Sequence, residues 1–210
     1  MDTVAIKTAF VLAGGKGERL RPLTDKRPKP MVEVNGAPLV HHHLQWLRDN
    51  GIERAFLLTG YQHHVVSKYF DVPRIEGLAV RCIAEDSPLG RGGAFRNGLN
   101  HADIEDQLIL GTNGDVITDQ ALDPIAIFHA QRRPRATVML TPMVSPYGTV
   151  SLDENGMIIG FLEKPTLPLW INAGVYVLDR ALVSEFPAQG DHEVSTFPAL
   201  AESGQLAGFQ

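Results

Sequence analysis

The stretch that decides the fold is FVLAGGKGERLRPLT, residues 10–24. It begins with an apolar run that is short enough for a buried strand. The chain then places glycine at three of the four positions 14–17 and cations at Lys16, Arg19 and Arg21. Glycine lets the backbone approach a ligand closely, and successive N–H groups in such a loop form a concavity that binds anions. A strand that ends in this loop predicts a polyphosphate site.

Lys29 stands between two prolines in the segment RPKPM, residues 27–31. Pro30 disfavours the helical backbone region for Lys29, and each proline fixes its own φ, so a stiff backbone directs the ammonium group. Two familiar phosphate motifs are missing: GxxxxGK[ST] does not occur, and GxGxxG fails because position 20 is leucine. The pattern therefore disfavours a P-loop and a dinucleotide-dependent oxidoreductase; an ordinary solvated basic loop is the remaining alternative.

The composition sets wider limits. The 210 residues are 44% hydrophobic, which suits one domain with a sizeable core. The net charge of −5 gives no reason to expect nucleic acid or a membrane surface as a partner. The single cysteine, Cys82, excludes a disulfide within the chain. We expect a cytoplasmic protein, because no signal peptide and no apolar run of about 18 residues is found.

Predicted strands alternate with predicted helices in the first half of the chain. This alternation predicts a Rossmann-like, mostly parallel α/β sheet flanked by helices, with right-handed crossovers. The second half predicts a smaller antiparallel hairpin around the turn at 153–156. Strands are expected at 8–13, 54–59, 80–84, 107–111, 136–140, 148–152, 157–163 and 171–178. Helices are expected at 38–50, 62–70, 121–130, 181–186 and 195–203, and one more follows the glycine-rich turn 85–94 and ends at about 99.

Two acidic residues follow predicted strands. Ligands of parallel sheets bind beyond the carboxyl ends of the strands, where the loops after the first, third and fourth strands converge. Asp115 lies there, and Mg²⁺ takes one or two carboxylates together with substrate phosphates; a turn or helix-cap aspartate is the alternative. Glu85 only accepts hydrogen bonds. It mildly favours guanine, which offers two adjacent donors, over uracil or thymine, which offer one.

The segments LAGGxGxRLxPLT and RPKPM together resemble the signature of the sugar-1-phosphate nucleotidyltransferases, or nucleotide-sugar pyrophosphorylases. The pattern is most similar to that of mannose and heptose 1-phosphate guanylyltransferases. Three later landmarks, YGTV at 147–150, EKP at 163–165 and NAG at 172–174, extend the resemblance over nearly all of the chain. It implies the nucleotide-diphospho-sugar transferase fold in a single domain, residues 1–210. The nucleotide half would run to about 118, and the sugar half, 119–210, would have an incomplete C-terminal end.

The resemblance also assigns roles to residues. Arg19 and Lys29 would be catalytic, stabilising charge at the α-phosphate and on the pyrophosphate, and Asp115 would bind the metal. The family commonly has threonine where this chain has Arg91, which leaves that local contact open. The implied nucleotide-binding residues are Leu12, Ala13, Gly14, Gly15, Lys16, Gly17, Glu85, Gly90 and Arg91. The implied sugar-phosphate-binding residues are Asn113, Tyr147, Gly148, Glu163, Lys164 and Asn172.

The implied reaction joins a nucleoside triphosphate to a sugar 1-phosphate, with Mg²⁺ as cofactor, and gives a nucleotide sugar and pyrophosphate. GTP with a manno-configured hexose or heptose 1-phosphate is the best guess. Uridylyl or thymidylyl transfer to a glucose or amino-sugar 1-phosphate is the first alternative. A non-catalytic regulatory subunit that binds a nucleotide sugar is the second, because the second metal-binding residue of the family is not found before Gln210. The sequence predicts no oligomeric state.

Overall fold

The computed structural model describes residues 5–210, which are built around one seven-stranded sheet. Strand β1, which begins the glycine-rich stretch, lies inside the sheet and pairs in parallel with β4 on one side and β6 on the other. Every pairing in this sheet is parallel except the two that β10 makes, with β6 and β7. The strands, in spatial order, are β11 (Leu206–Phe209), β7 (Ala136–Val144), β10 (Thr166–Asp179), β6 (Leu108–Asn113), β1 (Thr8–Leu12), β4 (Arg54–Thr59) and β5 (Ala79–Ala84).

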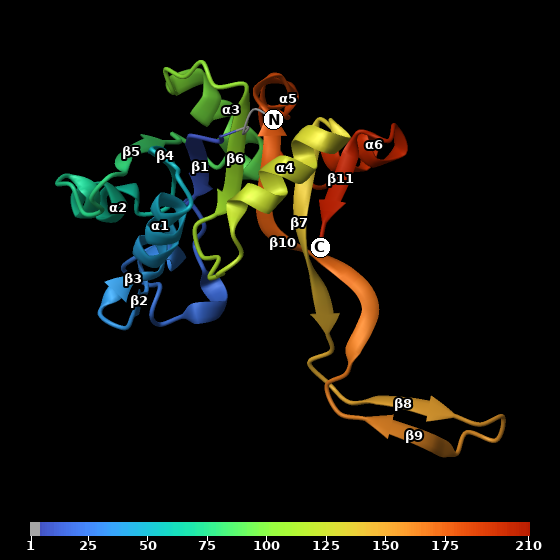
Figure 1. Cartoon of the computed structure of the whole chain (residues 1–210). Coiled ribbons are helices and arrows are strands. Elements are labelled where there is room, and N and C mark those ends of the chain that lie inside the picture. Colours follow the sequence, from blue (N-terminus) through green and yellow to red (C-terminus); the bar gives the residue numbers. More distant parts are fainter. Residues whose placement is uncertain (1–4) are drawn as a thin grey trace.

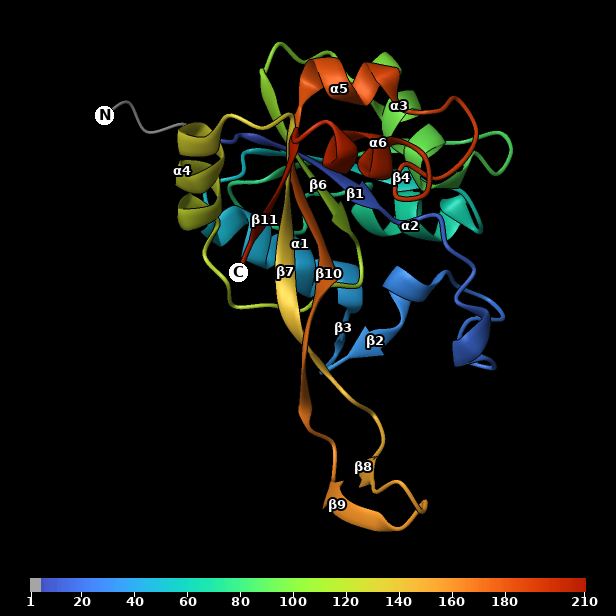
Figure 2. The ribbon, with the colours of Figure 1, turned by 90° about the vertical axis from the view of Figure 1, so that its right-hand side faces the viewer.

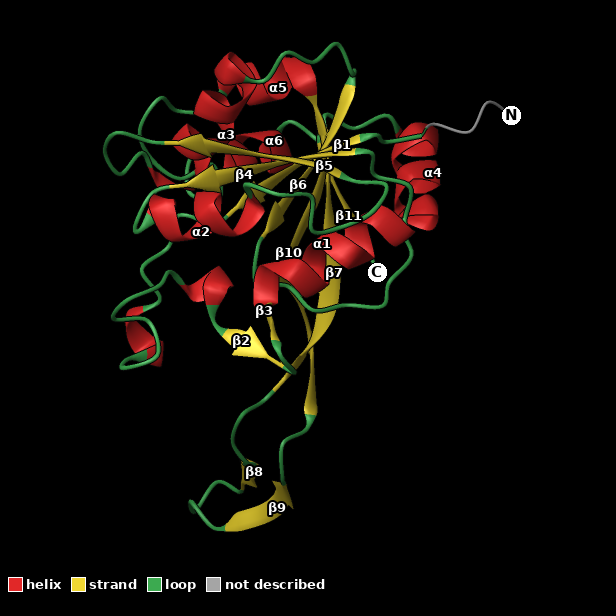
Figure 3. Ribbon diagram, turned by 90° about the vertical axis from the view of Figure 1, so that its left-hand side faces the viewer, coloured by secondary structure: helices red, strands yellow, loops and turns green. Residues whose placement is uncertain are grey.

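Helices cover both faces of the sheet, because alternate residues of its strands are apolar on both sides. Phe10 packs in one core cluster and its neighbour Val11 in the other. Figures 2 and 3 show helices on each side of the sheet. The Val11 side is covered by α1 (Leu39–Asp49), α2 (His63–Phe70) and α4 (Leu122–Arg132). The Phe10 side is covered by α3 (Gly90–His101), α5 (Arg180–Glu185) and α6 (Thr196–Glu202).

A long hairpin projects from the sheet. Strands β7 and β10 continue beyond their neighbours and carry a second hairpin, β8 (Thr149–Leu152) and β9 (Ile158–Leu162), far from the helices (Figure 1). We call residues 145–165 the arm. The Ser145 N–H donates a hydrogen bond of 2.9 Å to the Pro165 carbonyl and closes its base. The arm is rich in exposed apolar side chains: Tyr147, Val150, Leu152, Met157, Ile158, Ile159, Phe161 and Leu162.

The predicted elements are confirmed in type and order, with a few differences; strand β7, for example, extends to Val144, beyond the predicted 140. Strand β10 starts at Thr166, earlier than the predicted 171, because it also pairs with β7 along the projecting hairpin. Strand β11 was not predicted; it adds to the edge of the sheet in parallel with β7. The short pair β2 (Glu33–Val34) and β3 (Ala37–Pro38) was not predicted either. Residues 1–4 of the predicted domain lie outside the described part.

Two further observations bear on the expected class of protein. No described helix has both the length and the apolar character needed to cross a membrane. The free thiol of Cys82 lies half-buried in β5, where burial and the nearby Asp71 charge raise its pKa to about 11.

Candidate active site

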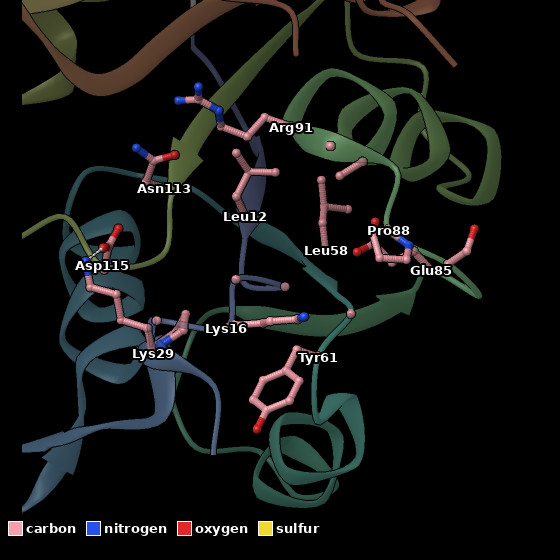
Figure 4. A pocket seen from close by; sticks show the side chains of 18 of the residues that line it. Leu12, Lys16, Lys29, Leu58, Tyr61, Glu85, Pro88, Arg91, Asn113 and Asp115 are labelled. Atoms are coloured by element: carbon pink, nitrogen blue, oxygen red, sulfur yellow. Dashed lines mark ion pairs between the residues drawn. The ribbon is translucent and has the colours of Figure 1, made fainter. Parts of the chain in front are cut away.

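A cleft of about 740 Å³ opens at the carboxyl edge of the four parallel strands β1, β4, β5 and β6 (Figure 4). The loops after the first, third and fourth predicted strands do converge there, together with the loop after β4. Eleven residues singled out from the sequence line it: Leu12, Gly14, Gly15, Lys16, Gly17, Lys29, Glu85, Gly90, Arg91, Asn113 and Asp115.

The glycine loop is fixed from both sides by the backbone of neighbouring loops. The Ala13 N–H donates to the Leu58 carbonyl at 2.8 Å, and the Gly114 N–H donates to the Leu12 carbonyl at 2.9 Å. A Cβ added to Gly14 would lie 3.0 Å from the backbone nitrogen of Gly60. The loop therefore sits so close to the loop after β4 that a side chain at position 14 would force the two apart.

Gly17 brings Lys29 against the glycine loop. Gly17 has a φ of +63°, and a Cβ there would lie 2.7 Å from the Cβ of Lys29. The Thr24 hydroxyl donates to the Gly17 carbonyl at 2.9 Å and holds this turn. The buried Pro30 anchors the short 3₁₀ helix Lys29–Met31. Glycine is needed at position 17 both for its backbone conformation and for this contact.

Lys29 and Asp115, predicted to be the catalytic cation and the metal ligand, form an ion pair on one side of the cleft (Figure 4). Their side chains are 37% and 27% exposed, so both remain accessible to a ligand. Among the described residues, no group of three or more His, Cys, Asp or Glu side chains is placed to hold a metal ion. Any divalent ion bound at Asp115 therefore takes most of its ligands from a substrate or from water.

Glu85 forms part of the opposite wall. Its carboxylate lies against Gly60, where a Cβ would collide with it, and its Oε2 accepts a hydrogen bond of 3.2 Å from the Leu89 N–H. Burial raises the pKa of Glu85, and this hydrogen bond opposes the rise. The position next to Gly14 and Gly60 confirms that Glu85 lies at the cleft.

Arg91 lines the cleft, but other groups of the protein engage its guanidinium. It forms ion pairs with Asp191 and with Glu193, which precede α6. Burial lowers the pKa of Arg91, but the hydrogen bond to Asp191 and the charges of Glu193 and Asp191 raise it by more. In this arrangement Arg91 joins the wall of the cleft to the loop before α6 instead of extending toward a phosphate.

The predicted sugar-side residues do not all come together. Asn113 lines the cleft, and Asn172, on β10, lines a separate hollow of about 430 Å³. The other four lie on the arm and do not line the cleft: Tyr147, Gly148, Glu163 and Lys164.

Arg19 is exposed on the 3₁₀ helix Glu18–Leu20 beside the cleft, and Ala13 is buried in the core beneath the glycine loop. Their roles stay predictions.

Several lining residues were not singled out from the sequence. Gly60 and Tyr61 follow β4, and Ser87 and Pro88 precede α3. The signal for Gly60 was present, because a loop that follows any parallel strand of the sheet ends at this edge.

Comparison with known proteins places this geometry in a family. The sequence profile of the family described as "Nucleotidyl transferase" matches residues 8–208. The chain belongs to this family. It is 37% identical over 204 residues to a mannose-1-phosphate guanylyltransferase of Mycobacterium tuberculosis, an alignment that covers 93% of this chain and 56% of that protein. It is 33% identical over 211 residues to a probable mannose-1-phosphate guanylyltransferase 2 of Arabidopsis thaliana, covering 94% and 57%. The chain thus spans just over half the length of these relatives.

Solved structures show the same fold. The crystal structure of HddC from Yersinia pseudotuberculosis superposes with a TM-score of 0.73 at 24% identity, covering 97% of this chain and 90% of that one. The same protein complexed with GMP-PN gives a TM-score of 0.71 at 23% identity over the same shares of the two chains. The predicted nucleotide-diphospho-sugar transferase fold is therefore confirmed.

Proposed function

We propose that this chain transfers a guanylyl group from GTP to a manno-configured hexose or heptose 1-phosphate in the cytoplasm and releases pyrophosphate. The observation that carries the proposal is the meeting of the glycine loop, Lys29 and Asp115 at one cleft. The relatives named mannose-1-phosphate guanylyltransferase, which align with more than 90% of the chain, support the choice of base and sugar. Those relatives are nearly twice as long, so the whole activity is a proposal for this chain.

The glycine loop and the opposite wall would bind the two ends of GTP. The backbone N–H groups of the loop form an anion-binding concavity for the triphosphate. Glu85 is placed to accept hydrogen bonds from the two adjacent donors of guanine. Gly14 and Gly60 leave room beside its carboxylate.

The reaction needs charge stabilisation more than proton transfer. An oxygen of the sugar phosphate attacks the α-phosphorus, and the bond from that phosphorus to the departing pyrophosphate oxygen breaks. A phosphate monoester has a second pKa of about 6, so the attacking group is already mostly dianionic at neutral pH. Lys29 would stabilise the charge that builds up on the phosphoryl oxygens, and Arg19, from beside the cleft, would stabilise the pyrophosphate.

Asp115 is the residue that would hold Mg²⁺. An accessible carboxylate beside the proposed triphosphate site suits Mg²⁺, which takes one or two carboxylates and completes its ligands from phosphates and water. When bound, the ion neutralises charge on the phosphate oxygens. The ion pair with Lys29 supports this role, because it brings the Asp115 carboxylate next to the proposed catalytic cation.

Asn113, in the cleft, and Asn172, at the adjoining hollow, would contact the sugar phosphate. The EKP segment on the arm would add the Glu163 carboxylate and the Lys164 ammonium, with Tyr147 and Gly148 beside them. These four residues would reach the cleft of their own chain only if the arm moved toward the sheet. Otherwise they would contact a sugar phosphate bound in the cleft of a second molecule.

The test is pyrophosphate release with Mg²⁺, measured for GTP, UTP, dTTP, CTP and ATP against a panel of hexose and heptose 1-phosphates. We expect release with GTP and a manno-configured acceptor. Release only with UTP or dTTP and a glucose or amino-sugar phosphate would replace the proposed base and sugar. Tight binding of a nucleotide sugar without release from any pair would support the regulatory alternative.

A further inference from the structure

The loop that carries Asp115 is held by one face of helix α1. This loop comprises residues 114–121, between the end of β6 and the start of α4. The backbone N–H groups of Gly114 and Val116 make hydrogen bonds that hold its beginning. Side chains from α1 and its C-terminal cap also bond to the loop or to its ends: His43, Trp46 and Asn50. Their spacing of three and four residues places them on the same face of the helix.

Trp46 and Asn50 hold the far end of the loop. Nε1 of Trp46 donates a hydrogen bond of 3.0 Å to the Gln120 carbonyl. Oδ1 of Asn50 accepts one of 2.9 Å from the N–H of Leu122, the first residue of α4. Asn50 is fixed in turn, because its Nδ2 donates to the Trp46 carbonyl at 2.9 Å. The far end of the loop is therefore tied to the C-terminal part of α1.

His43 bonds to the backbone or side chain on both sides of Asp115. Its Nδ1 lies 3.0 Å from the Val116 carbonyl oxygen, and its Nε2 lies 3.2 Å from the Thr112 hydroxyl. A carbonyl oxygen only accepts, so Nδ1 carries the proton and donates it to Val116. Burial lowers the pKa of His43 to about 4, although the Val116 hydrogen bond and the Asp115 charge oppose the shift. The ring is therefore neutral at pH 7, and Nε2 accepts a hydrogen bond from Thr112.

The surroundings of the His43 ring hold it in one orientation. His43 is 1% exposed, and its ring stacks on the indole of Trp46 with the ring centres 5.2 Å apart. The Thr112 side chain is fully buried in β6. Rotation of the imidazole would leave buried polar atoms without partners, which costs free energy. Helix α1 and strand β6 together therefore set the position of the Val116 carbonyl and of Asp115 before it.

Helix α1 also supports the segment that carries Lys29. The N–H of Leu39, the first residue of α1, donates a hydrogen bond of 2.9 Å to the Val32 carbonyl. Met31, in the same 3₁₀ helix as Lys29, is buried in the core cluster that includes Val40 of α1. One helix thus supports both members of the ion pair in the cleft.

We propose that His43 is a positioning residue: its hydrogen bonds on both sides of Asp115 keep that carboxylate beside Lys29, where it would bind Mg²⁺. This inference rests on the proposed function and adds to it a residue that does not line the cleft. The competing explanation is structural, namely that His43 only fills space between α1 and the sheet. Leu44 provides the matched control, because it is the next residue of α1, is fully buried and has no polar atom in its side chain.

The first measurement needs no ligand. Amide hydrogen exchange, followed by mass spectrometry, reports how often the segment 114–122 opens. We expect His43→Leu, which removes both hydrogen bonds, to speed this exchange about tenfold. We expect less than a threefold change in His43→Asn, because the asparagine amide nitrogen takes the place of Nδ1 and still donates to Val116. Leu44→Ala should lower the melting temperature and change the exchange of this segment less than threefold.

The second measurement tests the effect on metal binding. Mn²⁺, which suits the same oxygen ligands as Mg²⁺, is titrated into the protein saturated with GDP, and electron paramagnetic resonance measures the free ion. We expect His43→Leu to weaken Mn²⁺ binding about tenfold, the low end for a lost residue that orients a metal ligand, and to change GDP affinity without metal less than twofold. Asp115→Asn should also weaken Mn²⁺ binding. In that background His43→Leu should have no further effect, because it acts through Asp115.

Other outcomes overturn the inference in distinguishable ways. Unchanged exchange in His43→Leu, or equal effects of His43→Leu and Leu44→Ala, would assign His43 the structural role. Equal losses of Mn²⁺ affinity from His43→Leu with and without Asp115 would show that it does not act through that carboxylate. A wild-type protein that binds no GDP would refute the proposed function itself. If thermal melting shows that His43→Leu does not fold, Thr112→Val replaces it; it removes one partner of the ring, and we expect about threefold effects.

Discussion

At the scale of single residues, the proposed reaction depends on Lys29, the cation that pairs with Asp115. We predict that Lys29→Ala lowers kcat/KM for pyrophosphate release by roughly 10²–10³, which is typical of a lost donor that stabilises a transition state. Lys26→Ala is the matched control, since Lys26 is an exposed cation of the same segment and does not line the cleft. Steady-state kinetics with the best substrate pair measure both variants. A loss below threefold would remove Lys29 from the catalytic residues.

A buried histidine makes stability depend on pH. His192 is fully buried among aromatic rings, stacked on Phe186 at 4.8 Å, and neither ring nitrogen has a hydrogen-bond partner among the described residues. Burial lowers its pKa to about 4, although the charges of Glu193 and Asp191 oppose the shift. The unfolded chain takes up the proton near pH 6.5, so between pH 6.5 and 4 it binds more protons than the folded state. The free energy of unfolding therefore falls as the pH drops through this window.

We predict that His192 accounts for about 2 kcal/mol of stability lost between pH 7 and pH 5. His192→Phe should remove this share, because a phenyl ring fills the aromatic site and takes up no proton. Urea unfolding at the two pH values measures it, with His64→Phe at an exposed position as the control. Some pH dependence should remain, since burial also lowers the pKa of His43 to about 4. Equal pH dependence in the His192 variant and the wild type would contradict the prediction.

The sequence predicts the site residues that stand in a local pattern, but not the contacts between segments that are far apart in the chain. Lys29 and Asp115 were predicted because each stands in a local pattern, a proline frame or a strand end. The ion pairs of Arg91 with Asp191 and Glu193 follow no such pattern, because they join segments that lie far apart in the sequence. Contacts between distant segments form only when the sheet brings them together, so the printed sequence gives no sign of them.

At the scale of elements, the glycine loop and the Lys29 segment form one unit through Gly17. We predict that Gly36→Ala costs about 1–2 kcal/mol of unfolding free energy and that Gly17→Ala costs more, because both positions have positive φ, +81° and +63°, but only a Cβ at position 17 collides with Lys29. Only Gly17→Ala should also lower kcat/KM, about tenfold or more, since misplacing a catalytic group by 1 Å costs up to about a hundredfold. A Cβ at position 36 meets nothing within 4 Å, so Gly36→Ala isolates the backbone effect.

Urea unfolding and steady-state kinetics on the two glycine variants separate the effects. Full turnover by Gly17→Ala would show that Lys29 does not depend on the loop for its position.

Element prediction succeeded where a strand or helix carried its own pattern. Strand β11 has only four residues and gains its place by pairing with β7, so no local periodicity indicates it. The early start of β10 has the same cause, because residues 166–170 are extended by their partner strand and not by an alternating pattern.

At the scale of the whole molecule, the arm and the nucleotide cleft are separate structures. We predict that replacing residues 147–163 by a short Gly-Ser linker leaves GDP affinity within twofold of the wild type, because none of them lines the cleft. The hydrogen bond between Ser145 and Pro165 closes the base of the arm and allows a short bridge. Sugar-dependent pyrophosphate release should be lost, because Glu163 is removed and Lys164 is displaced.

Calorimetric titration with GDP and the release assay test this deletion. A large loss of GDP affinity would mean that the arm contributes to the nucleotide site. The deletion should also reduce self-association at high protein concentration, because it removes several exposed apolar side chains, among them Tyr147 and Ile159, 77% and 69% exposed. Sedimentation velocity at several concentrations measures that change.

The turn at the tip of the arm has a practical consequence for labelling chemistry. Residues 153–156 lie at the end of the molecule most distant from the helices (Figure 1). A cysteine placed at Asn155 would be an exposed thiol, whereas Cys82 is half-buried with a pKa near 11. Because the thiolate is the reactive form, a maleimide dye at neutral pH would attach at the tip in preference to Cys82. Because Cys82 would react little with the dye, the fluorescence of the labelled protein would report on the arm.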